Sequence, residues 1–320
     1  MKTLSIITGF LGSGKTTLLN RLLKDPAMGN TAVLINELGA VGVDNLIVDE
    51  FDDDIVLLES GCVCCSVRDD LTASLLNLFD RGKRGDVPAF EQAVLETTGV
   101  ADPAGILQLL MADEAVCERY VLGNVVTLVD ACFAPQNLAD IPEAARQVQM
   151  ADRLVLSKTD LVTGGQSRQL RARLAELNTV ALLLISADAT PQELFASTSQ
   201  HTLNPDLPDL SHGTRFTTFQ VRWDEVVDWS QLEAWLEGLL SARGEDILRI
   251  KGIVNVAGES RPTVLQSGQH SAYAPMQLIG WPGGEPYSEL TFIAQNFSQA
   301  AAYNSLRPFI GEPLHACRGT

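Results

Sequence analysis

The sequence lacks any apolar run long enough to cross a membrane, and it has few basic residues and few histidines. Its 320 residues include 40 acidic and 23 basic side chains, which gives a formal net charge of −17. A surface this acidic repels nucleic acid phosphates and anionic lipid headgroups. We therefore expect neither a nucleic-acid-binding protein nor a membrane protein, although such a surface would attract cations or a basic partner.

Internal repeats and low-complexity tracts are also lacking, and we expect no export signal. Lys2 and the following "LSIITGFLG" imitate a signal peptide, but the apolar run is short, contains Thr8 and Gly9, and has no small-residue cleavage site. We expect a cytoplasmic protein whose six cysteines are reduced thiols. Those outside the cluster at positions 62–65 are expected to be packing or surface residues: Cys117, Cys132 and Cys317.

Short apolar strands alternate with amphipathic helices over the first two hundred residues. The predicted strands are 4–8, 32–36, 55–58, 92–96, 125–130, 153–157 and 181–186. The predicted helices are 15–24, 68–80, 103–111, 143–150 and 167–177. Because several strands are apolar throughout, as strands buried on both faces are, the pattern predicts an α/β domain with a mainly parallel sheet.

The composition of the sequence changes at "HTLNPDLPDLSHG", which has two prolines and little periodicity and is typical of a linker. The predicted organisation is an α/β domain over residues 1–200, a linker over 201–213 and a smaller α+β domain over 214–313. In the second domain the predicted strands are 215–223, 247–256, 261–268 and 289–296, and the predicted helices are 229–240 and 298–306.

The segment "GFLGSGKT" matches the phosphate-binding pattern G-x-x-x-x-G-K-[ST], with a predicted strand before it and a helix after it. Glycines allow backbone N–H groups to converge on phosphate oxygens, and the helix N-terminus adds its positive end. Lys15 is expected to reach the β- and γ-phosphates, Thr16 to ligate Mg²⁺ and Thr17 to hold the α-phosphate. The predicted phosphate-binding set is Gly9, Gly12, Ser13, Gly14, Lys15, Thr16 and Thr17.

A second motif, "SKTD", follows a predicted strand and is a variant of the guanine signature N-K-x-D with Ser157 in the first place. Asp160 would accept hydrogen bonds from guanine N1–H and the 2-amino group, while the stem of Lys158 packs on the ring. Downstream, Ser186 and Ala187 in "ISADA" are placed to offer a backbone N–H to the guanine O6. Taken alone, "SKTD" is also compatible with a helix cap, but the order of these motifs favours GTP over ATP.

Acidic residues end two of the predicted strands. Glu96 in "LETTG" is the candidate for ordering Mg²⁺ or the attacking water, although no unambiguous general base is evident. Gly99 is placed to give an N–H to the γ-phosphate and to act as a switch hinge. Glu37 in "NELG" is either a second residue facing Mg²⁺ or a polar loop residue. The predicted catalytic residues are Lys15, Glu96 and Gly99.

With the phosphate loop, "NELG", "GCVCC", "ETTGVADP" and "SKTD" in this order, the chain resembles the CobW-like family of metal-associated P-loop GTPases. The segments "ILRIKGIVNVAGESRPTVLQ" and "ELTFI" are similar to the small C-terminal domain of that family, so the resemblance covers nearly the whole chain. It implies slow GTP hydrolysis with Mg²⁺ and a transition-metal site at the C-x-C-C motif. It also implies delivery of zinc or cobalt to a client protein or cofactor pathway.

The implied metal ligands are Cys62, Cys64 and Cys65. In an extended segment Cys62 and Cys64 point to the same side, and Cys65 follows at a turn. Thiolates select Zn²⁺, Co²⁺ or Cu⁺ over Mg²⁺, and three ligands leave a site open to exchange. A disulfide is not expected, because adjacent cysteines would form a strained ring. Redox chemistry of the clustered thiols and their burial as packing residues are the alternatives.

Two features depart from the family pattern. Ala40 stands where members often carry a Glu that can join the metal site, which leaves the identity and affinity of the metal open. A His-rich segment near the domain junction is also missing, because His201, His212, His270 and His315 are not clustered.

The mechanism favoured by the sequence couples the two sites. GTP with Mg²⁺ would order the segments around Glu37 and Glu96, set the cysteine site to hold a metal, and release the metal to a client on hydrolysis. Two alternatives stay open: a P-loop kinase that phosphorylates a small molecule, and a nucleotide-gated scaffold without metal cargo. The sequence is compatible with an oligomer.

Overall fold

The computed structural model describes residues 1–35, 56–59, 67–196, 217–268, 271–272, 275–277, 281 and 285–310. The chain divides into two compact units. The first comprises Met1–Arg171 with Ala181–Ser197, and the second comprises Ala172–Val180 with Thr198–Thr320. The predicted linker at 201–213 lies outside the described residues, so its boundaries stay predictions. No helix in the described ranges is long and apolar enough to span a membrane.

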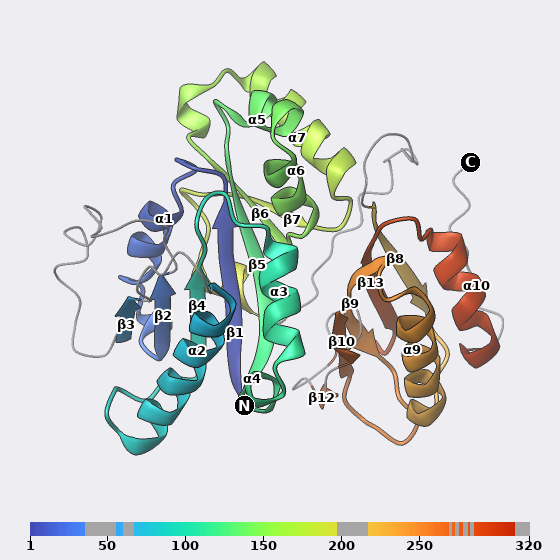
Figure 1. Ribbon diagram of the computed structural model, residues 1–320. Helices are drawn as coiled ribbons and strands as arrows, with labels where there is room; N and C mark the ends of the chain where they lie inside the picture. Colours follow the sequence, from blue (N-terminus) through green and yellow to red (C-terminus); the bar gives the residue numbers. More distant parts are fainter. Residues whose placement is uncertain are drawn as a thin grey trace. The chain divides into compact units, whose positions relative to one another are not determined.

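A parallel sheet forms the centre of the first unit (Figure 1). Among the described residues, its seven strands lie in the order β3-β2-β4-β1-β5-β6-β7, and every neighbouring pair is parallel. The strands are β1 (Lys2–Gly9), β2 (Thr31–Ile35), β3 (Val56–Glu59), β4 (Gln92–Glu96), β5 (Tyr120–Asp130), β6 (Arg153–Ser157) and β7 (Leu182–Ile185). The predicted α/β fold class is confirmed.

Helices cover both faces of this sheet. They are α1 (Lys15–Leu22), α2 (Val67–Arg84), α3 (Pro103–Ala112), α4 (Glu114–Arg119), α5 (Ala134–Asp140), α6 (Pro142–Gln149) and α8 (Pro191–Phe195), whereas α7 (Gly164–Leu177) has its first residues in this unit and its last ones in the second. One face is covered by α1 and α8, whose Leu18, Leu22 and Leu194 pack on Val94 and Val126 of the sheet. Figure 1 shows α2 and α3 side by side on the sheet, and right-handed crossovers place them on the face opposite α1.

The strand order places the functional loops. The chain leaves β1 toward β2 on one side, and it leaves β4 toward β5 on the other side of β1. Ligands of open α/β sheets bind outside the carboxyl ends of the strands, at such a reversal of strand order. The phosphate loop after β1 and the segment after β4 therefore meet at the same edge of the sheet.

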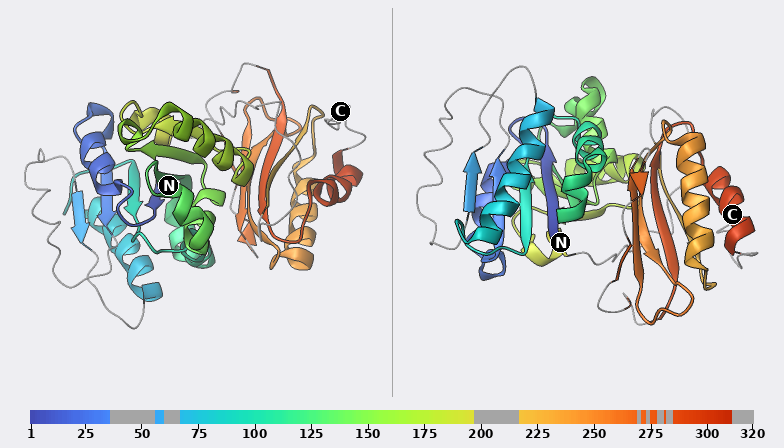
Figure 2. Two further views of the ribbon diagram at one scale, coloured as in Figure 1. Left: turned by 90° about the horizontal axis from the view of Figure 1, so that it is seen from above. Right: turned by 60° about the horizontal axis from the view of Figure 1, so that its bottom comes forward.

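A six-stranded sheet forms the second unit, within the described residues, with β11-β10-β9-β13-β8 in order and β12 paired to β10. The strands are β8 (Thr217–Trp223), β9 (Ile247–Val254), β10 (Thr263–Gly268), β11 (Ser271–Ala272), β12 (Met276–Gln277) and β13 (Ser288–Ala294). Figure 2 shows the helices α9 (Trp229–Arg243) and α10 (Gln299–Ile310) on the same face of this sheet. Their Trp235, Leu239 and Leu306 join Phe219 and Phe292 in one core. The predicted α+β arrangement is confirmed.

Two local differences from the predicted elements have physical causes. β5 begins at Tyr120 rather than at residue 125. The prediction started this strand too late, because Gly123 and Asn124 have the composition of a turn. A side chain at Gly123 would collide with Ser5 and Thr3 of β1, so this glycine allows close packing of the two strands. The helices α4, α5 and α8 were not predicted, because they span only 6, 7 and 5 residues and show little periodicity.

Candidate functional site

The phosphate loop, residues 9–16, connects β1 to α1. Gly12 and Gly14 have φ angles of 73° and 92°, which favour glycine over residues with a Cβ. The Ser13 N–H donates to the Phe10 carbonyl at 3.1 Å and closes the turn. Lys15 is buried, and its ammonium donates to the Gly9 carbonyl at 2.9 Å. This hydrogen bond directs the positive charge from the end of the loop back to its first residue. Thr17 is exposed on the first turn of α1.

Thr16 and Glu96, each predicted to serve Mg²⁺, meet at the carboxyl edge of the sheet. The Thr16 hydroxyl donates to Glu96 Oε1 at 2.8 Å. Their strands explain this contact, because β1 and β4 are paired with Ile7 opposite Glu96, at the carboxyl end of both strands. Hydroxyl and carboxylate oxygens are hard ligands that suit Mg²⁺. The donor set beside the phosphate loop therefore fits this ion.

The segment after β4 approaches the phosphate loop closely. The Thr97 hydroxyl donates to the Thr8 hydroxyl at 2.9 Å, so the first residue of the segment is hydrogen-bonded to β1. A Cβ on Gly99 would lie only 2.6 Å from the Leu11 backbone nitrogen. Glycine at this position is thus required by close approach of two backbones, which places Gly99 beside the loop that is expected to hold the phosphates.

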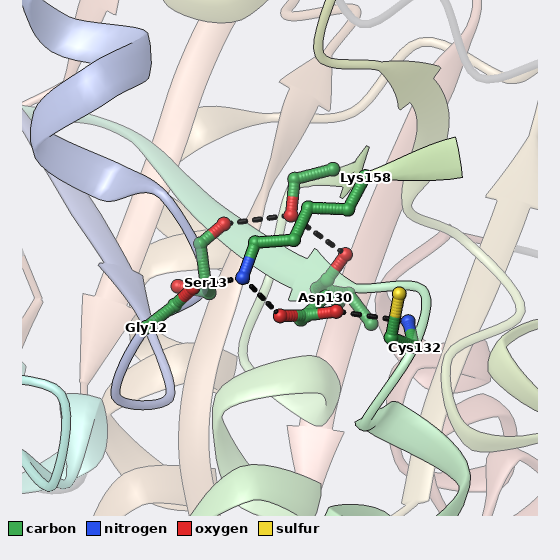
Figure 3. Close-up of polar contacts among 7 residues, drawn as sticks. Gly12, Ser13, Asp130, Cys132 and Lys158 are labelled. Atoms are coloured by element: carbon green, nitrogen blue, oxygen red, sulfur yellow. Dashed lines mark hydrogen bonds and ion pairs between the residues drawn. The ribbon is translucent and has the colours of Figure 1, made fainter. Parts of the chain in front are cut away.

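Lys158, in the "SKTD" motif after β6, lies between the phosphate loop and Asp130 (Figure 3). Its φ of 55° is unusual for a residue with a side chain. The ammonium donates to the Gly12 carbonyl at 2.9 Å and forms an ion pair with Asp130 Oδ2 at 2.6 Å. The Ser157 hydroxyl donates to the Ser13 carbonyl at 2.7 Å. Two successive residues of the motif therefore hold the backbone of the phosphate loop.

Asp160 and the loop after β7 hold the remaining residues of the predicted base site. Asp160 is exposed within a single 3₁₀ turn, Thr159–Leu161. Arg21 of α1 donates to the carbonyls of Ser186 and Ala189, both at 2.7 Å. Ala187 lies between these two anchored residues and is exposed. The loop that is predicted to contact the guanine O6 is therefore tied to the helix that follows the phosphate loop.

The predicted metal ligands Cys62, Cys64 and Cys65 lie outside the described residues, as do Glu37 and Ala40. Within the described ranges, no group of three or more His, Cys, Asp and Glu side chains could hold a metal ion. The cysteine cluster therefore stays the only metal site that the sequence predicts for a soft cation.

Cys117 and Cys132 are half-buried thiols. Burial, followed by the charge of Asp113, raises the pKa of the Cys117 thiol. Burial and then Asp130 raise the pKa of the Cys132 thiol, although Lys158 opposes the shift. Because the thiolate is the form that binds metals, neither cysteine is tuned as a ligand at neutral pH.

Sequence reasoning missed three residues that position this site: Arg21, Asp130 and Gln147. Asp130 carried a usable signal, because it is an acidic residue at the end of the apolar strand "VVTLVD", as Glu96 is at the end of β4. Arg21 and Gln147 carried none, because their partners lie far away in the sequence and are set by the fold.

Comparison with known proteins matches both parts of the chain. Residues 3–184 match the CobW/HypB/UreG nucleotide-binding domain, and residues 216–310 match the C-terminal domain of the cobalamin synthesis protein CobW. The chain is 32% identical over 315 residues to the zinc chaperone YjiA of Escherichia coli, covering 95% of this chain and 98% of that protein. It is 27% identical to the zinc chaperone CobW of a Sinorhizobium species, over 82% of this chain and 84% of that protein.

The solved structures agree with these matches. The crystal structure of the Zn(II)-bound YjiA GTPase from E. coli superposes with a TM-score of 0.67 at 27% identity, covering 96% of this chain and 98% of that one. The match extends over the parallel sheet and the smaller second unit. The resemblance that the motifs indicated is thereby confirmed, and the chain belongs to the CobW family, with a CobW/HypB/UreG nucleotide-binding domain followed by a CobW C-terminal domain.

Proposed function

We propose that this protein is a GTP-hydrolysing zinc chaperone, which binds zinc at Cys62, Cys64 and Cys65 and passes it to a client protein. Support comes from the family, from relatives named zinc chaperones and from a zinc-bound structure of one of them. The observation that carries the proposal is the phosphate loop, with the Thr16–Glu96 pair at one end and Lys158 at the other.

The nucleotide would be held along this loop. The Lys15 ammonium and the N–H groups of the loop bind phosphate oxygens, while Lys158 and Asp160 hold the guanine ring and its edge. Mg²⁺, bound by Thr16 and Glu96, would neutralise charge on the β- and γ-phosphates. Gly99 would offer its N–H to the γ-phosphate, and Glu37 stays a predicted second residue at this end. Because the sequence offers no unambiguous general base, slow hydrolysis is expected without a partner.

Zinc is the favoured cargo, because the named relatives are zinc chaperones. Thiolates also suit Co²⁺, so cobalt stays an alternative cargo. The cysteine motif follows β3, which pairs with β2, and β2 pairs with β4 and its terminal Glu96. A change at the γ-phosphate would therefore reach the cysteines across neighbouring strands, and loss of phosphate would loosen the zinc site and release the ion.

The proposal is tested by measuring zinc affinity against a chromophoric chelator, together with phosphate release from GTP. Cys64→Ser should weaken zinc binding by at least about tenfold, because it removes one of three thiolates. Cys117→Ser, which changes a half-buried cysteine on α4, is the matched control and should bind zinc normally.

Two results would count against this function. If Cys64→Ser bound zinc as the wild type does, the thiols would be incidental and the protein would be a scaffold GTPase. If phosphate passed from GTP to a small-molecule acceptor rather than to water, the kinase alternative would hold.

A further inference from the structure

Gln147 lies in the last turn of α6, and its side chain is 1% exposed. The side-chain amide nitrogen donates to the Gly99 carbonyl at 3.1 Å and to the Ala101 carbonyl at 3.0 Å. Both partners are acceptors, so both N–H groups of the amide are used. The backbone carbonyl of Gln147 accepts a hydrogen bond from Thr127 Oγ1 of β5 at 2.7 Å. Gln147 thus joins the central sheet to the segment that carries Gly99.

The same segment is held from the other side by the phosphate loop. Gly99 approaches Leu11 so closely that a Cβ on Gly99 would meet both the backbone and the side chain of Leu11. Leu11 and Gln147 also line one cavity of about 20 Å³, so they lie on adjoining walls. Gly99 is therefore enclosed between the loop and α6.

A neighbouring ion pair extends this connection. Arg146 Nη1 lies 2.9 Å from Asp102 Oδ2, and the other carboxylate oxygen of Asp102 accepts from the Ala104 N–H at the start of α3. Two successive residues of α6 therefore hold the segment 99–102 at both of its ends. Arg146 and Asp102 are partly exposed, whereas the amide of Gln147 is buried and would be the stronger anchor.

We propose that Gln147 is a positioning residue for GTP hydrolysis, which fixes the Gly99 segment against the phosphate loop before the γ-phosphate arrives. Preorganised donors stabilise a transition state without the cost of ordering them during the reaction. Without the amide, the buried Gly99 carbonyl and the partly buried Ala101 carbonyl lose this donor, and the segment relaxes away from the loop. The inference rests on the proposed contact of the Gly99 N–H with the γ-phosphate.

The test replaces Gln147 by methionine, which has a similar length but no N–H donor. Hydrolysis at saturating GTP should slow by about tenfold, while the affinity for GDP, which has no γ-phosphate, should change by less than about twofold. Gln136→Met, at an exposed position on α5, is the matched control and should leave both quantities unchanged. A general loosening of the fold would instead weaken GDP binding and hydrolysis together.

Several results would overturn the proposal. Unchanged hydrolysis in Gln147→Met would do so, and so would a parallel loss of GDP affinity. If that variant does not fold, hydrogen exchange of the wild-type peptide 97–102 decides: the proposal requires protection without nucleotide, and exchange at the rate of an unstructured peptide contradicts it. Gly99→Ala separates the two claims. Normal hydrolysis there would overturn the γ-phosphate contact and the positioning role with it, whereas a loss in Gly99→Ala alone would overturn only the role of Gln147.

Discussion

At the scale of single residues, the Lys158 side chain is placed by a buried carboxylate. Asp130 is 6% exposed, and its second oxygen accepts from the Cys132 N–H at 2.8 Å, which orients the carboxylate toward Lys158. Asp130→Asn keeps the shape but removes the charge. We expect GDP affinity to fall by about tenfold, because Lys158 loses an ion pair that is partly screened from solvent. Fluorescent GDP titration measures this, with exposed Asp140→Asn as the control; equal affinities would contradict the role.

We expect Asp160 to determine the preference for guanine, and a nucleotide with a different base tests this role. Asp160 should accept from guanine N1–H and the 2-amino group, whereas an Asn amide can donate to the 2-carbonyl of xanthine. Asp160→Asn should therefore weaken GDP binding by about tenfold to a hundredfold and strengthen binding of xanthosine diphosphate. Competition between the two nucleotides measures the exchange. A variant that kept its preference for GDP would show that the base is recognised elsewhere.

Site residues that lie within one motif could be predicted from the sequence. Of the contacts that the sheet makes between distant motifs, only some could be predicted. The Thr16–Glu96 contact was predictable, because a hydroxyl in the phosphate loop and an acid at a strand end both serve Mg²⁺. The Lys158–Asp130 pair was not predicted, since it depends on β5 lying beside β6 with Asp130 opposite Ser157. Periodicity gives a strand and its burial but does not give its neighbours.

At the scale of elements, α1 and the β7–α8 loop are joined by Arg21. Its guanidinium holds the Ser186 and Ala189 carbonyls, so the loop between them has a fixed path. Arg21→Ala should raise the dissociation rate of GDP by about threefold to tenfold. The reason is that the β7–α8 loop, which is predicted to contact the guanine, loses two charge-assisted hydrogen bonds near the exposed surface. Stopped-flow displacement measures this, and Arg168→Ala, exposed on α7, is the matched control. No change in the rate would exclude a positioning role for Arg21.

β13 carries an acid whose titration should affect the second unit. Burial raises the pKa of Glu289, and Arg222 opposes the shift. A Glu with a raised pKa in the folded state binds its proton more tightly when folded. The contribution of Glu289 to the stability of this unit is therefore largest below the ordinary Glu pKa of about 4.3 and is lost as the pH rises from there through the folded pKa.

Glu289→Gln should relieve this loss. The variant keeps an amide oxygen for the hydrogen bond from Gln220 but carries no buried charge. We expect a larger free energy of unfolding at pH 7 and a weaker pH dependence above pH 4.3, measured by urea denaturation across that range. Glu237→Gln on the exposed side of α9 should leave the pH dependence unchanged. A Glu289→Gln variant that is less stable at pH 7 would show that the charge is stabilising.

At the scale of the whole molecule, the two units have separate cores. Leu18, Val94 and Val126 belong to the core of the first, and Trp235 and Phe292 to that of the second. Apolar strands alternating with helices predicted the α/β fold of the first unit, because strands buried on both faces are apolar throughout. The order of one strand, a helix and then several strands predicted the α+β fold of the second. The connection between nucleotide and metal is a hypothesis drawn from the sequence, because the cysteines lie outside the described residues.

The central claim is that the bound nucleotide controls the affinity of the protein for zinc, and one measurement tests this claim most directly. Zinc affinity should be measured by chelator competition with Mg²⁺ and either a non-hydrolysable GTP analogue or GDP. We predict tighter binding with the GTP analogue, by at least about tenfold, corresponding to about 1.4 kcal/mol of coupling. Equal zinc affinity in the two nucleotide states would contradict the account, because hydrolysis could then not release the metal.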